Sequence, residues 1–158
     1  MFYPKKMSGN LRSWEEFPAK AGSYMAGQLL TIADGLLAPL DGASTTTPPY
    51  LCQTDRTVTE GETIPVVRVS YDTIYETSLS ADAADAKIGT MLQVSAGGKQ
   101  ADAGAEGSFE VVYIEDTAAG SVVQGRFHAS SGAGAANIEV ATNQEVSDTI
   151  EETFKEGE

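Results

Sequence analysis

The chain has 158 residues, 41% of them hydrophobic, which is enough to build one compact domain with a core and excludes a wholly disordered chain. Its net charge of −13 argues against direct binding to nucleic acid, because polyphosphate would be repelled. Its single cysteine excludes an intrachain disulfide, and without an apolar run of about 18 residues we expect neither a transmembrane helix nor a secretory signal.

The first 23 residues differ in character from the rest of the chain. Residues 1–20 carry a net charge of +2, and five aromatic residues fall within the first 24 positions. This stretch has no clean period and is interrupted by Pro4, Gly9, Pro18 and Gly22. We therefore predict an extended arm over residues 1–23. The alternative is that its aromatic residues pack on the chain's own sheets as an ordinary first strand.

From residue 24 to residue 140 the pattern is that of β-structure, and much of it occurs twice. The passage that begins Gly27-Gln28-Leu29-Leu30 returns as Gly89-Thr90-Met91-Leu92, and each copy ends in a β-rich run, 64–69 and 122–127. We place the two copies at residues 27–79 and 88–129. The sequence predicts a mainly β fold, a small β-barrel or β-sandwich built from two related β units.

The last part of the chain, residues 141–158, reads as an acidic helix or tail. Val146, Ile150 and Phe154 recur at a spacing of four, which predicts a short amphipathic helix over residues 144–155. The domain organisation we predict is thus an arm, a β domain over residues 24–140 and this carboxyl-terminal segment.

No pattern of reactive residues stands out in either copy. His128 is the only histidine and has no nucleophile signature around it, while Cys52 lies inside an expected strand. One cysteine and one histidine cannot fill a structural zinc site, and the carboxylates fall mainly in turns. We predict no enzymatic activity, no cofactor and no metal site. A scaffold that is duplicated without a reactive site suits a structural or binding protein.

Two passages resemble the capsid decoration, or cement, proteins of tailed bacteriophage heads. One is residues 21–30, Ala-Gly-Ser-Tyr-Met-Ala-Gly-Gln-Leu-Leu, followed by a turn at Gly35. The other is residues 113–123, in which Glu115-Asp116-Thr117-Ala118-Ala119-Gly120 leads into Val122-Val123. The resemblance covers residues 20–127. The second copy of the pattern and the acidic carboxyl-terminal segment depart from it.

The resemblance implies a non-catalytic virion protein on the outer surface of the capsid, made in the cytoplasm of a bacterial host. Its partner would be the lattice of the major capsid protein, with no contact to nucleic acid or membrane, and trimers would be the favoured homo-oligomer. Arms of such proteins lie on the capsid, so we expect the arm to carry the contact through eight residues: Phe2, Tyr3, Lys5, Lys6, Arg12, Trp14, Phe17 and Tyr24. The alternative is a glycan- or receptor-binding module with an aromatic patch around Tyr71, Tyr75 and Trp14.

Overall fold

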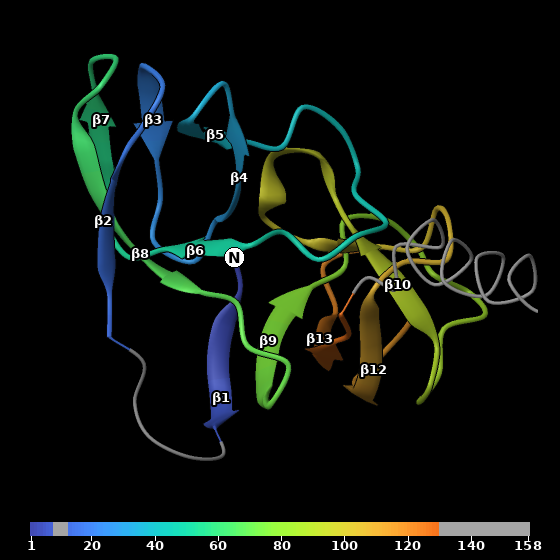
Figure 1. Ribbon diagram of the computed structural model, residues 1–158. Coiled ribbons are helices and arrows are strands. Elements are labelled where there is room, and N and C mark those ends of the chain that lie inside the picture. The colour runs from blue at the N-terminus through green and yellow to red at the C-terminus, as the bar shows by residue number, and fades with distance from the viewer. Residues whose placement is uncertain (8–12, 130–158) are drawn as a thin grey trace, which may run out of the picture.

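A computed structural model describes residues 1–7 and 13–129 of the chain, which form antiparallel β-strands in two main sheets (Figure 1). The prediction of a mainly β, sandwich-like fold is confirmed, and the ladders of the described strands do not close into a barrel. Arg12 and the helix predicted over residues 144–155 lie outside the described residues.

The first sheet has five strands. Their order across the sheet is β2 (Glu15–Pro18), β8 (Thr63–Arg68), β6 (Tyr50–Cys52), β4 (Leu29–Ala33) and β5 (Leu36–Pro39). A separate two-stranded ladder joins β3 (Gly22–Tyr24) to β7 (Arg56–Val58). Residues 15–68 are called the first unit here.

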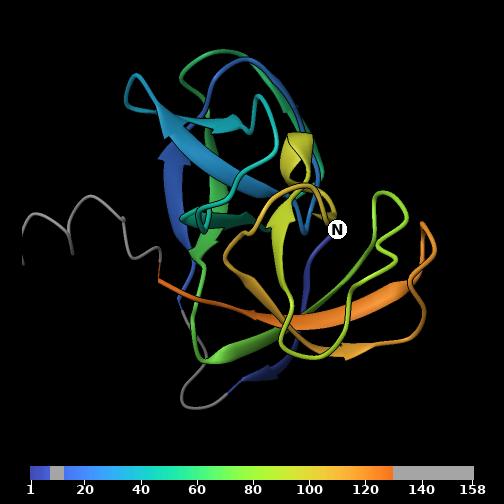
Figure 2. The same ribbon diagram turned by 90° about the vertical axis from the view of Figure 1, so that its right-hand side faces the viewer.

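The second sheet has six strands. Their order is β1 (Tyr3–Met7), β9 (Thr73–Ser78), β13 (Val122–Phe127), β12 (Phe109–Ile114), β10 (Met91–Val94) and β11 (Ala101–Asp102). A short 3-10 turn, η1 (Ala96–Gly98), lies between β10 and β11. Residues 73–127 are called the second unit, and Figure 2 shows the two units stacked one above the other.

The two sheets have the same strand order. Reading β2-β8-β6-β4-β5 against β9-β13-β12-β10-β11 pairs each strand of the first unit with one strand of the second. In each unit a parallel bridge then joins the end of the first strand to the last strand, at Ala19–Leu37 and at Leu79–Ala101. In each unit the five corresponding strands are therefore curled until the first and the last of them meet at one point.

Individual hydrogen bonds are repeated as well. Three backbone bonds of the first unit have counterparts in the second, all between 2.8 and 2.9 Å. The bond from Gly27 N to Cys52 O corresponds to that from Gly89 N to Val111 O. The bonds from Lys20 N to Leu37 O and from Gly61 N to Ala19 O correspond to those from Ser80 N to Ala101 O and from Gly120 N to Leu79 O, respectively. Shared sheet order and shared bonds make the units structural copies of one another.

The structure moves the boundaries of the two copies. The sequence assigned residues 73–78 to the end of the first copy, but β9 lies in the second sheet, where it corresponds to β2. The first strand of the first unit is then supplied by residues 15–18, inside the stretch interpreted as an arm. That interpretation is wrong for residues 1–7 and 13–23, because β1, β2 and β3 each pair with a strand of the chain's own β domain.

The units are joined by a continuous interface. Ser44 pairs with Val94 through two backbone bonds of 2.8 and 2.9 Å, and the Gln28 side-chain amide donates to the Gly97 carbonyl at 2.9 Å. The Gly97 amide donates to the Leu40 carbonyl at 3.0 Å. Beneath these bonds one apolar cluster combines side chains of both sheets with Phe2, which packs against Phe109 and Phe127.

Candidate surface for binding a partner

The open edge of β1 is the most distinctive surface of the described chain. Among the described strands β1 pairs only with β9, and its side chains are exposed along its whole length. Tyr3 is 53% exposed, Lys6 is solvent-facing and Lys5 lies 3.5 Å from the Glu76 carboxylate. A basic and aromatic strand edge on an acidic protein is suited to contact with another chain.

A shallow hollow continues this surface onto the neighbouring strands. Lys6, Met7, Asp72, Ile74 and Arg126 line it. Its lining combines two cations and one carboxylate with a methionine and an isoleucine. Such a hollow can receive an acidic side chain together with its aliphatic stem.

Trp14 is a second exposed anchor, at the start of β2. Trp14 is 70% exposed. Because a tryptophan side chain stabilises a contact most when it is buried, this exposure suits a residue that becomes covered by a partner. By strand register Trp14 corresponds to Ile74 of β9, which β1 pairs with at Lys6. Of the described strands, none occupies the place beside β2 that β1 occupies beside β9. Among residues 1–7 and 13–129, the edge of β2 at Trp14 therefore has no strand beside it.

Three of the predicted contact residues belong to the fold and not to the surface. Phe2 is 0% exposed and Tyr24 is 1% exposed. The Tyr24 hydroxyl donates to the Lys20 carbonyl at 2.7 Å, and burial raises the pKa of this hydroxyl. Phe17 is half-buried with its ring centroid 5.2 Å from that of Tyr50. The sequence predicted that these three side chains contact another protein, whereas their partners lie in the same chain.

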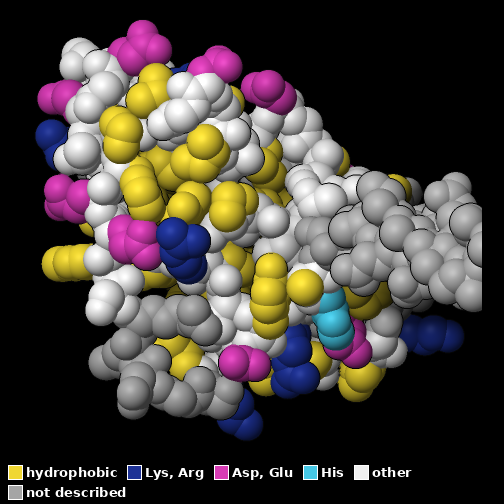
Figure 3. Space-filling view, viewed as in Figure 1, with side chains coloured by type: hydrophobic (Ala, Val, Ile, Leu, Met, Phe, Trp, Pro, Cys, Tyr) yellow, Lys and Arg dark blue, Asp and Glu magenta, His cyan; other side chains and the backbone are white. Residues whose placement is uncertain are grey.

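The structure also differs from the aromatic patch that the alternative, a glycan- or receptor-binding module, requires. Tyr75 is buried, its ring lies 5.5 Å from that of Phe127, and its hydroxyl accepts the Ser70 amide at 3.0 Å. The prediction of a glycan-binding patch formed by Tyr71, Tyr75 and Trp14 is therefore wrong, because Tyr75 is not at the surface. Figure 3 shows instead that hydrophobic side chains gather on the face over the first unit.

The remaining candidates for chemistry are the single histidine and the single cysteine of the chain. His128 contacts the Glu110 carboxylate at 2.5 Å on the second sheet. Cys52 is buried in the first unit and its thiol donates to the Thr54 carbonyl at 3.2 Å. Burial raises the pKa of this thiol, which disfavours the nucleophilic thiolate. Among residues 1–7 and 13–129, no cluster of three metal-ligating side chains occurs.

Cys52 is expected to resist thiol reagents in the folded protein and to react fully once the chain is unfolded. Because its pKa is raised by folding, the unfolded chain ionises first as the pH rises past about 8.5, and the free energy of unfolding falls over that range. Burial of Tyr24 acts in the same direction at higher pH. Urea unfolding from pH 7 to pH 10 measures the slope, and a Cys52→Ala variant that keeps the same slope would contradict the assignment.

Comparison with known proteins yields no relative: neither a family model nor a curated protein matches the chain. In the part of the chain that is described, no helix has the length and apolar character needed to cross a membrane. The functional argument therefore rests on the surface built by β1 and β2. The sequence did not reveal that this surface consists of two strand edges. The signal was the correspondence between Glu16 in β2 and Glu76 in β9, 60 residues apart, because these two strands are the first strands of the two units.

Proposed function

We propose that the chain is a structural virion protein that binds the outer surface of a bacteriophage capsid and stabilises the head. The observation that carries the proposal is the open, basic and aromatic edge formed by β1 and by Trp14 before β2. The resemblance of residues 20–127 to capsid decoration proteins supplies the class of partner.

The contact is made by strand edges and not by a free arm. A strand of the major capsid protein adds to β2 as β1 adds to β9, so that main-chain bonds supply affinity and side chains supply specificity. Trp14 becomes buried on binding, and Lys5 and Lys6 face acidic groups of the shell. Many copies on one lattice convert a weak single contact into firm attachment.

The rest of the molecule suits this role. Both units are closely bonded β scaffolds, and the net charge of −13 keeps free copies soluble and away from packaged DNA. The expectation of trimers and the absence of enzymatic activity remain predictions.

Trp14→Ala is expected to weaken binding to expanded, undecorated heads of the phage that encodes the chain by about 30-fold, since loss of an aromatic hot spot costs about 2 kcal/mol. Co-sedimentation of labelled protein with heads measures the affinity. Ile88→Ala is the matched control, because Ile88 is equally exposed at 72% but lies outside the surface. Equal affinity of the two variants, or no binding by the natural chain, would overturn the proposal.

A further inference from the structure

The interface between the two units joins two different surfaces of the same structural motif. The second unit contributes the turn between β10 and β11, with Val94, Gly97 and Gly98. The first unit contributes a docking surface of Gln28, Leu29 and Leu40. A contact of this head-to-tail kind leaves one surface of each type unused, because each unit contains a version of both.

The first unused surface is the turn between β4 and β5 in the first unit. It corresponds to the β10–β11 turn, because Ile32 pairs with Leu37 as Val94 pairs with Ala101. Val94 is 0% exposed and its backbone pairs with Ser44 of the first unit, whereas Ile32 is 44% exposed. No heavy atom lies within 4 Å of a Cβ built at Gly35 on this turn. This turn therefore projects an apolar side chain into solvent.

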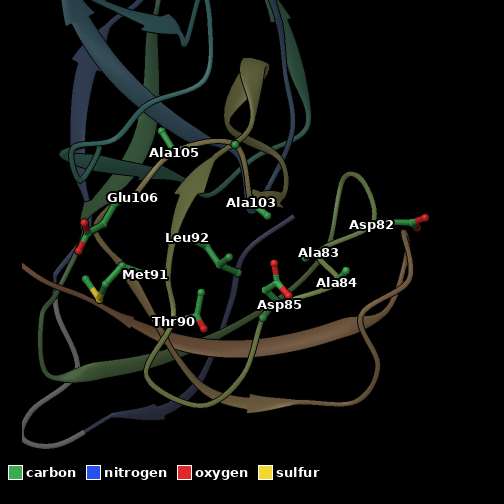
Figure 4. A pocket seen from close by; sticks show the side chains of 12 residues that line it. Asp82, Ala83, Ala84, Asp85, Thr90, Met91, Leu92, Ala103, Ala105 and Glu106 are labelled. Atoms are coloured by element: carbon green, nitrogen blue, oxygen red, sulfur yellow. The ribbon is translucent and has the colours of Figure 1, made fainter.

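The second unused surface is a hollow in the second unit. By strand register Gln28, Leu29 and Leu40 correspond to Thr90, Met91 and Gly104, and all three of these line one hollow of about 360 Å³. Figure 4 shows Thr90, Met91 and Leu92 lying between Asp85 on one side and Glu106 on the other. The hollow thus occupies the place at which the first unit receives a turn.

We propose that the β4–β5 turn of one copy of this chain docks into the hollow of a second copy, between Asp85 and Glu106, and so repeats the contact that joins the two units within each chain. Ile32 packs on the alanines and Met91 of the hollow, at the position that corresponds to Val94, whose backbone pairs with Ser44 of the first unit. Because the contact is head-to-tail, its repetition produces a ring or an open chain of copies.

Charge and turn length both limit the strength of the contact between copies. The Lys20 ammonium lies 3.3 Å from the Asp34 carboxylate at the β4–β5 turn, so docking brings an ion pair of no net charge, and not a free cation, toward the acidic rim of the hollow. The β4–β5 turn is shorter than its counterpart, and Thr90 lacks the side-chain amide donor of Gln28. The contact between copies is therefore weaker than the one within the chain.

Sedimentation velocity of the full chain over a concentration series tests the proposal. The natural chain is expected to self-associate. Ile32→Asp, which alters the turn, and Ala105→Arg, which fills the hollow, are each expected to raise the dissociation constant about tenfold or more. Tyr71→Asp is the matched control, an equally drastic change at a side chain that is 48% exposed between β8 and β9 and belongs to neither surface. Circular dichroism and thermal melting establish that each variant is folded.

Mixing the two variants gives the decisive result. The Ile32→Asp copy retains its hollow and the Ala105→Arg copy retains its turn, so the mixture is expected to form one-to-one dimers that neither variant forms alone. A natural chain that stays monomeric, folded variants that associate as before, or a mixture that stays monomeric would each overturn the inference. None of these results depends on capsid binding, which the Trp14 experiment measures separately.

Discussion

Replacing Phe2 by alanine is expected to lower the free energy of unfolding by about 3–5 kcal/mol, although the residue is second in the chain. Its ring is fully buried and lies 5.6 Å from that of Phe109 and 5.7 Å from that of Phe127. The Phe2 amide also donates to the Gly27 carbonyl at 2.8 Å, which ties the segment to the first unit. The truncation leaves a cavity where the two units share one apolar cluster.

Tyr3→Ala is the matched control. Tyr3 is the next residue, is aromatic and is 53% exposed, so its loss is expected to change the free energy of unfolding by no more than about 0.5 kcal/mol. Urea unfolding monitored by fluorescence and circular dichroism measures both variants. If the first residues formed a free arm, the two substitutions would have equally small effects.

The sequence was sufficient to predict the class of fold and the existence of a repeat. Alternating side chains in residues 64–69 and 122–127 predict strands, and β8 and β13 do bury Ile64 with Val66 and Val123 with Phe127. The passages beginning at Gly27 and Gly89 were paired correctly, because the same backbone bonds recur at both. Local pattern and turn chemistry are enough for these features.

The position of the first strands could not be predicted in the same way. Pro18 and the mixed polarity of residues 15–18 are unfavourable for an interior strand, yet β2 is an edge strand, where such residues are tolerated. Only pairing with β8, nearly 50 residues later, fixes its place. Likewise, a burial of Phe2 between residues 109 and 127 is a long-range contact that no local period encodes.

The unused turn and hollow could not be predicted from the sequence for a related reason. Ile32 and Val94 are chemically alike, yet Val94 is buried and bonded to Ser44 of the other unit, whereas Ile32 is 44% exposed. A repeated sequence predicts repeated surfaces, but which copy of each surface is already occupied depends on how the units are stacked. The same ambiguity affects the paired glycines of the two turns.

Gly98→Ala is expected to destabilise the protein by about 2–3 kcal/mol more than Gly35→Ala. Both glycines have positive φ, +74° and +77°, so an alanine incurs a backbone cost of about 1–2 kcal/mol at each. A Cβ at Gly98 would also lie 2.1 Å from the Leu29 carbonyl oxygen, whereas one at Gly35 meets nothing within 4 Å. The overlap forces the units apart or distorts the turn.

The difference between these two variants isolates the interface from the turn itself. Urea unfolding gives the two free energies, and the shared backbone cost cancels when they are subtracted. A difference near zero would mean that the β10–β11 turn does not press on the first unit. A large difference establishes the close backbone contact on which the head-to-tail arrangement within the chain depends.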